Sequence, residues 1–260
     1  MKQWNGLLKK EWATMSGHLY ATVGVSLLFS LLIPFCSTLF NWGLGFLEFS
    51  LILSAVWMGA SVLIPTVILL VSLGKEMGRP DIWLHSTASI FKMFGSKAIF
   101  AGFVGAMNML IPVIIIVIES RFTGFPVALS FKVILEIGGL LFFVLYMMSL
   151  LVMCTGLFFG VLYQLIKPVM RGFAIPNVVI LFLFSAWIFE RIASTSAYEK
   201  VTSFGPIIGP GEGVLKVGKG DSYFTMDETV FYTGEILFDL LVAVILFATA
   251  VVLFEKKVRI

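Results

Sequence analysis

Residues 133–162 read VILEIGGLLFFVLYMMSLLVMCTGLFFGVL, and Glu136 is the single charged side chain among them. A helix needs roughly 20 apolar residues to cross the hydrocarbon core of a bilayer. This stretch is long enough to cross at a tilt or to project beyond the bilayer. It also lacks the apolar–polar alternation of membrane β-barrel strands. The segment therefore predicts a membrane-spanning α-helix.

The rest of the chain has the same character. Of the 260 residues, 59% are hydrophobic and 13% are charged, whereas a soluble domain carries roughly a quarter charged residues. Six apolar segments approach or exceed the roughly 18-residue length of a span. We expect the spans at about 19–40, 46–73, 98–118, 133–162, 174–189 and 236–254. The predicted fold class is an all-α integral membrane protein with six transmembrane helices, and 1–260 forms a single transmembrane domain.

The distribution of charge predicts which way the chain crosses the membrane. With six spans and the N-terminus inside, two thirds of the Lys and Arg residues fall on the inner side and most acidic residues fall on the outer side. Cytoplasmic loops carry an excess of Lys and Arg. We therefore expect both termini to be cytoplasmic.

The segment before the first span is amphipathic. Trp4, Leu7, Leu8 and Trp12 recur at helical spacing, and lysines occupy much of the rest of the turn pattern. A helix with this pattern lies in the plane of the membrane interface. We expect an interfacial helix at 3–16; a water-facing extension of the first span is the alternative.

The long external segment, 190–235, is rich in Gly and Pro. This composition predicts a turn-rich loop with a small hairpin or a re-entrant segment. Its residues 213–220 approach the phosphate-binding pattern G-x-x-x-x-G-K-[ST], but Gly220 replaces the hydroxyl that would hold Mg²⁺. His18 and His85 have no Cys or acidic partner at metal-ligand spacing. We expect no catalytic, metal or nucleotide site on this chain, so it is not predicted to be an enzyme.

Two further patterns each leave two interpretations open. Four acidic residues stand at the outer ends of spans: Glu48, Glu136, Glu190 and Asp239. They are either interfacial residues that reach the headgroups or an outer vestibule for a cationic or amphipathic substrate.

Gly156 and Gly160 form a G-x-x-x-G spacing, which permits close helix approach either at a dimer interface or within the bundle.

The polar stretch 74–97, GKEMGRPDIWLHSTASIFKMFGSK, is far longer than a turn between two spans requires. Pro80 suits the first position of a short helix, and Asp81 suits its first turn. Trp83 then adds apolar surface that a solvated linker does not need. The stretch is either a surface helix on lipid headgroups or a docking element for a cytoplasmic partner.

The chain resembles the ABC-2 type permeases, the membrane subunits of bacterial ATP-driven exporters. The resemblance rests on LLKKEW at 7–12, six spans with both ends inside, and the loop GKEMGRPDIWLHS at 74–86, which looks like loops of Gram-positive permeases. One departure is Lys75-Glu76-Met77-Gly78-Arg79, where the family usually has an acidic "EKE…GT" lead.

The resemblance implies a coupling helix in the loop 74–97, gripped by an ATPase subunit. The implied contact residues are Arg79, Pro80, Asp81, Ile82, Trp83, Leu84 and His85, with Trp83 as the main anchor. ATP and Mg would be bound by that ATPase and not by this chain. The implied partners are the ABC ATPase, a second permease copy or paralogue, and membrane lipid, with no nucleic acid. The implied location is the bacterial plasma membrane.

The implied function is export of an amphipathic substrate such as a peptide antibiotic or a lipid. Two other classes remain as alternatives. One is a secondary carrier or channel that works without ATP, and the other is a membrane immunity or sensor protein that binds a ligand without moving it.

Overall fold

The structure is a computed structural model that describes residues 2–40, 46–77, 89–122, 131–208, 216–219, 222–225 and 230–258. Its helices are α1 (Lys2–Leu27), the π-helix η1 (Leu28–Leu32), α2 (Ile33–Leu39), α3 (Phe46–Ser61), α4 (Ile64–Met77), α6 (Ile90–Phe122), α7 (Phe131–Met170), the 3-10 helix η2 (Arg171–Phe173), α8 (Ala174–Ala193), α9 (Ser196–Thr202) and α10 (Thr233–Val258). The strands are β1 (Pro206–Ile208), β2 (Lys216–Lys219), β3 (Ser222–Thr225) and β4 (Val230–Tyr232). β1 pairs antiparallel with β4, and β2 pairs antiparallel with β3, all within the predicted external segment.

Within the described ranges, five helices are long and apolar enough to cross a membrane, and six if the bent pair α3–α4 is counted as one span. The prediction of an all-α protein built from helices of membrane-spanning length is therefore confirmed. The segments are Gln3–Cys36, Ile90–Glu119, Gly138–Met170, Ala174–Ala193, Thr233–Lys256 and the pair Phe49–Ser61 with Ile64–Met77.

The first segment differs from the expectation of a separate interfacial helix at 3–16. α1 is unbroken from Lys2 to Leu27, and helix continues through η1 and α2 to Leu39. No proline interrupts 3–27. Gly6, Gly17 and Gly24 each cost a helix only about 1 kcal/mol. The N-terminal residues thus continue into the first long helix without a break.

The second predicted span, 46–73, is two helices. α3 ends at Ser61, α4 begins at Ile64, and their axes differ by 41°. Pro65 stands at the start of α4, where it has no N–H to continue the helical hydrogen bonds from α3. This proline accounts for the bend.

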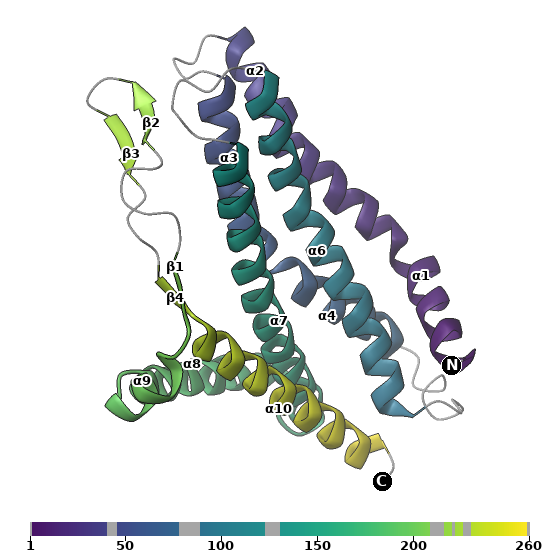
Figure 1. Ribbon diagram of the computed structural model, residues 1–260. Helices are drawn as coiled ribbons and strands as arrows, with labels where there is room; N and C mark the ends of the chain where they lie inside the picture. Colours follow the sequence, from purple (N-terminus) through teal and green to yellow (C-terminus); the bar gives the residue numbers. More distant parts are fainter. Residues whose placement is uncertain are drawn as a thin grey trace.

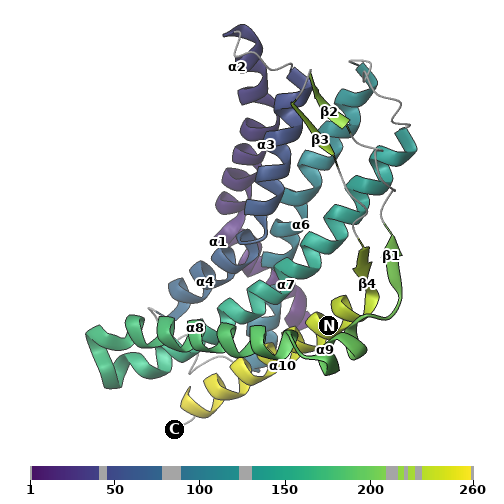
Figure 2. The ribbon, with the colours of Figure 1, turned by 90° about the vertical axis from the view of Figure 1, so that its left-hand side faces the viewer.

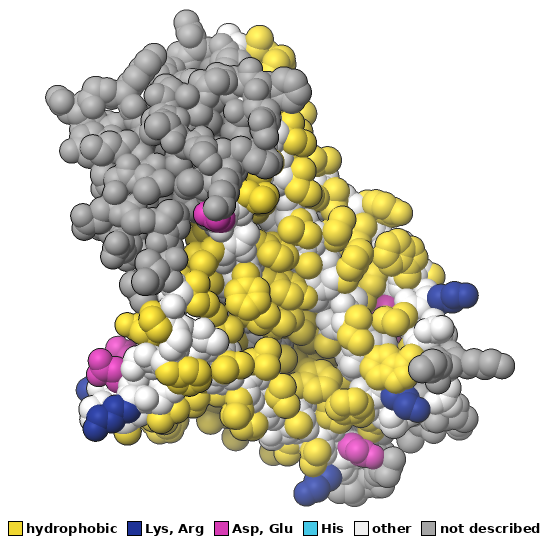
Figure 3. Space-filling view, viewed as in Figure 1, with side chains coloured by type: hydrophobic (Ala, Val, Ile, Leu, Met, Phe, Trp, Pro, Cys, Tyr) yellow, Lys and Arg dark blue, Asp and Glu magenta, His cyan; other side chains and the backbone are white. Residues whose placement is uncertain are grey.

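α6 occupies the centre of an upright group of helices. It packs against α1, α3, α4 and α7, and α1, α3 and α6 run side by side in Figures 1 and 2. α8 and α10 run crosswise to that group in both views. Hydrophobic side chains cover most of the described face in Figure 3, as expected of a surface whose solvent is lipid.

Gly156 and Gly160 pack inside this chain. A Cβ on Gly156 would come 2.3 Å from Thr66 Cγ2, and one on Gly160 would come 2.7 Å from Leu70 Cδ2. Both contacts join α7 to α4, so the G-x-x-x-G spacing is used for packing within the bundle.

Candidate functional site: a buried ion network

A cluster of charged side chains joins α1, α4 and α6. Lys97 Nζ donates to Glu11 Oε1 at 2.7 Å and to Ser72 Oγ at 2.8 Å. Ser72 Oγ donates in turn to Glu11 Oε2 at 2.7 Å. Lys97 also forms an ion pair with Glu76 Oε2 at 3.2 Å, and Lys10 Nζ binds Glu76 Oε1 at 2.6 Å. We call Lys10, Glu11, Ser72, Glu76 and Lys97 the inner ion network.

The inner ion network is sealed on one side and open on the other. The side chains of Lys97 and Glu11 are 2% and 5% exposed, whereas that of Lys10 is 42% exposed. Two lysines face two glutamates, so the formal charges cancel. A buried ion pair of this kind contributes little net stability compared with apolar packing, but loss of one partner leaves an uncompensated charge. The network therefore locks one arrangement of three helices.

Two residues of the inner ion network lie near the ends of α4 and α6 that face each other in the sequence. Glu76 is the second-to-last residue of α4, and Lys97 lies two turns into α6. Residues 78–88 of the polar stretch 74–97 connect these two helices in sequence and lie outside the described residues. The ion pair between Glu76 and Lys97 clamps the two ends of this stretch together, and both residues are tied to α1. The ion pairs thus join α1, α4 and α6 into one unit.

The seven residues predicted to contact an ATPase, Arg79 to His85, lie outside the described residues. The predicted interfacial residues are described and pack largely on α6 and the core. A Cβ on Gly95 would come 2.8 Å from Trp4 Cη2, and Leu7 packs against the hydrophobic core. Leu8 is half-buried. Trp12 is 46% exposed and its ring meets Phe100 edge-on.

The predicted outer acids do not form one cluster. Glu136 is exposed near the start of α7, at the opposite end of the molecule from α9 (Figures 1 and 2). Glu190 and Asp239 share one corner, where the Tyr198 ring contacts both Phe189 and Phe238. The side chain of Glu48 is outside the described residues.

At the corner shared by Glu190 and Asp239, burial raises the pKa of the Tyr198 hydroxyl. The carboxylates of Asp239 and Glu235 raise this pKa further. The tyrosine is therefore neutral at physiological pH.

Two polar pairs farther along α6 were not anticipated. Asn108 Nδ2 donates to Thr22 Oγ1 at 3.0 Å, and Ser50 Oγ donates to Glu119 Oε2 at 2.7 Å. Lys97, Asn108 and Glu119 are spaced by 11 residues, which is close to three full helical turns. This spacing places all three on one face of α6, and it is a signal that the sequence already contained.

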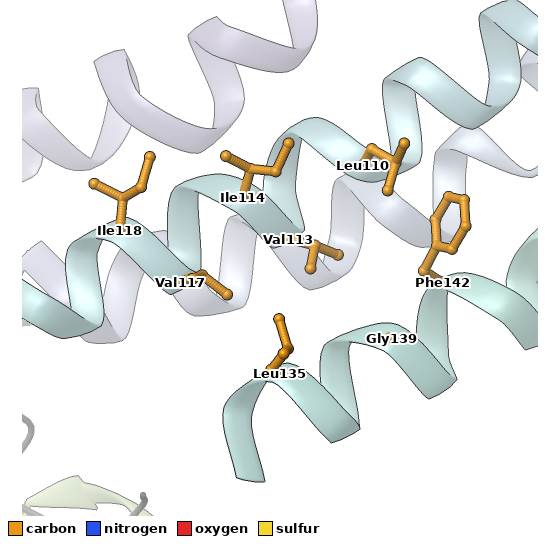
Figure 4. Close-up of a pocket in the computed structure, with 8 residues that line it drawn as sticks. All are labelled: Leu110, Val113, Ile114, Val117, Ile118, Leu135, Gly139 and Phe142. Carbon is orange, nitrogen blue, oxygen red and sulfur yellow. The ribbon is translucent and has the colours of Figure 1, made fainter. Parts of the chain in front are cut away.

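An apolar groove lies between α6 and α7, with a volume of about 330 Å³ (Figure 4). Its lining consists of Leu110, Val113, Ile114, Val117, Ile118, Leu135, Gly139 and Phe142. Among the described residues, the groove is lined by hydrocarbon and by no charged or hydrogen-bonding side chain. Elsewhere in the described ranges, no group of three or more His, Cys, Asp or Glu side chains is placed to hold a metal ion.

These features define the class of the protein. Apolar helices of membrane-spanning length surround a small polar interior, so the chain is a multi-pass α-helical membrane protein. No family model, curated protein or solved structure matches the chain.

Proposed function

We propose that this chain is the membrane-spanning subunit of an ATP-driven transporter of the ABC-2 permease type. A separate ATPase subunit docks on the loop 74–97, and a second membrane subunit completes the complex. The transported substrate is an amphipath such as a peptide antibiotic or a lipid, and it is exported from a bacterial cell whose cytoplasm contains both termini of the chain.

The inner ion network is the observation that supports this proposal best. A transporter driven by an external motor needs a stiff connection between the docking loop and the spanning helices. Glu76 and Lys97 hold the two helices that flank the loop, with an ion pair of 3.2 Å between them. Glu11 adds α1 to the same unit through its 2.7 Å contact with Lys97. A secondary carrier has no need of such a connection at a loop that nothing grips.

The experiment compares ATP turnover by complexes purified from the membranes of the source cells through a tag on this chain. The wild-type complex is expected to hydrolyse ATP in a vanadate-sensitive manner. Trp83→Ala should abolish this activity and the co-purification of the ATPase, while membrane insertion stays normal. Trp187→Ala is the matched control, because Trp187 is 52% exposed on α8 and far along the chain from the loop.

The proposal fails if the wild-type complex contains no ATPase, or if the Trp83→Ala complex keeps an unchanged ATP turnover. Transport by the chain alone in vesicles without ATP would instead identify a secondary carrier or channel.

A further inference from the structure

A set of buried polar atoms has no hydrogen-bond partner among the described residues. These atoms are the hydroxyls of three serines, the Trp57 indole N–H and the Asn108 side-chain carbonyl oxygen. The serines and Asn108 have fully buried side chains. We call this set the polar seam, and its members are Ser26, Ser30, Ser54, Trp57 and Asn108.

The members come from α1, η1, α3 and α6, and they are spread over about two helical turns of the bundle. α3 runs back along α1, and Ser50 Oγ donates to the Ser30 carbonyl at 3.1 Å. This antiparallel register predicts that Ser54 lies at the level of Ser26, one turn farther along α3 and one turn back along the first helix. The Phe29 ring of η1 stacks on the Trp57 ring of α3 at 5.1 Å, so η1 and α3 are in contact beside these serines.

α6 brings Asn108 to the same region. Glu11 pairs with Lys97 and Thr22 with Asn108, each across an offset of 86 residues. α1 and α6 therefore run parallel in a constant register, and Pro112 of α6 comes level with Ser26.

Prolines add a further acceptor to the polar seam. Pro112 has no N–H for the carbonyl of Asn108, one turn before it. Pro34 follows the π-helix η1, in which the Ile33 N–H donates to the Leu28 carbonyl, and the Ser30 carbonyl of η1 accepts from the Ser50 hydroxyl at 3.1 Å. The polar seam thus combines an indole donor, an amide acceptor, a backbone carbonyl to which Pro112 cannot donate and hydroxyls that can serve as both.

Groups of this kind are rarely left unpaired inside a protein. Buried polar atoms without protein partners are usually bonded to ordered water, which needs two to four polar partners at one place. The backbone groups that prolines release in membrane helices are satisfied by hydroxyl side chains or by water. The mixture of donors and acceptors here suits water, which both donates and accepts.

We propose that the polar seam is a hydration site in the interior of the membrane-spanning bundle, in which ordered water bridges α1, α3 and α6. Ser26 and Ser54 hold the water from opposite sides, and Asn108 and Trp57 complete its hydrogen bonds. The inference does not depend on the proposed transport function.

The test rests on the sign of a change in Tm. If water bonds the hydroxyls, Ser26→Ala and Ser54→Ala each remove a hydrogen bond, and each should lower Tm by about 2–4 °C. In the double variant, Tm should fall by less than the sum of the two single-variant decreases, because both serines bind the same water. If the hydroxyls are unpaired, their removal leaves Tm unchanged or raises it, since Ala is the better helix former. That outcome overturns the proposal.

Ser185→Ala is the matched control, because Ser185 is exposed on α8 and its hydroxyl donates to the Phe182 carbonyl of its own helix. Its Tm should not fall. A second measurement detects the water directly by X-ray radiolysis, in which bound water produces hydroxyl radicals that oxidise adjacent rings. Oxidation of Trp57 should fall severalfold in the Ser26→Ala/Ser54→Ala protein, while that of the exposed Trp12 stays constant. Equal Trp57 oxidation in the two proteins would contradict the proposal, whatever the Tm values.

Discussion

The Lys97 ammonium lies 2.7 Å from the Glu11 carboxylate, although the two residues are 86 positions apart in the chain. Thr22 and Asn108 meet with the same offset. Two polar contacts thus set the register of two parallel helices, one at the end of the bundle and one in its interior. A slip by one residue along either helix would break both contacts.

Lys97→Met tests how strongly the inner ion network holds the fold. The change leaves Glu11 buried without its cation, so the free energy of unfolding should fall by about 3–5 kcal/mol in a denaturant titration in micelles. Lys9→Met is the control: Lys9 is exposed beside the network, and its loss should change stability by no more than about 0.5 kcal/mol.

Glu11→Gln combined with Lys97→Met removes a negative and a positive charge together. The double variant should be more stable than the sum of the two single changes predicts, because neither charge is left alone. Strictly additive effects would show that the two side chains do not interact.

Gly156→Ala tests the close contact between α7 and α4. The new methyl group would come 2.3 Å from Thr66 Cγ2, and overpacking of this kind costs about 1–3 kcal/mol. Thr66→Ser in the same protein removes that Cγ2 atom and should restore stability. Gly139→Ala is the matched control on α7, because a Cβ there meets no atom within 4 Å. Equal stability of the Gly156→Ala and Gly139→Ala proteins would contradict the packing.

The Asn108–Thr22 hydrogen bond should appear as a coupling energy in a double-mutant cycle with Asn108→Ala and Thr22→Val. Side-chain hydrogen bonds between membrane helices average about 0.6 kcal/mol and reach about 1.7 kcal/mol. A cycle that pairs Asn108 with Thr155, whose hydroxyl bonds to Leu151 of its own helix, should give a coupling near zero. If both cycles give the same coupling energy, the hydrogen bond between Asn108 and Thr22 does not form.

The proposed function makes a separate prediction for the inner ion network. The Glu11→Gln/Lys97→Met protein should still bind the ATPase, because the docking residues are unchanged. Transport per ATP hydrolysed should nevertheless fall about fivefold or more, as expected when a coupling free energy is lost. Transport assays with the purified complex in vesicles measure this ratio, and an unaltered ratio would remove the network from the coupling path.

The sequence by itself determined the class of the fold. Transfer of a segment into lipid depends on its own composition, so apolar runs such as 133–162 reveal membrane helices without knowledge of their neighbours. The bend between α3 and α4 and the continuity of α1 were harder to predict from the sequence. The bend depends on the single residue Pro65 within a long apolar run, and the continuity of α1 depends on the absence of a helix-breaking residue between its amphipathic and apolar parts.

The tertiary structure decided which side chains of the chain contact one another. In the sequence, Glu11, Glu76 and Lys97 are three charges far apart in the chain. The spacing of Gly156 and Gly160 fits a dimer contact and internal packing equally well. Composition cannot tell which helix faces which, because hydropathy is a sum over a segment and carries no information about rotation around the helix axis. Rotation and register brought Lys97 to Glu11, Asn108 to Thr22 and Gly156 to Thr66, since contacts across more than 80 residues form only when several helices pack at once.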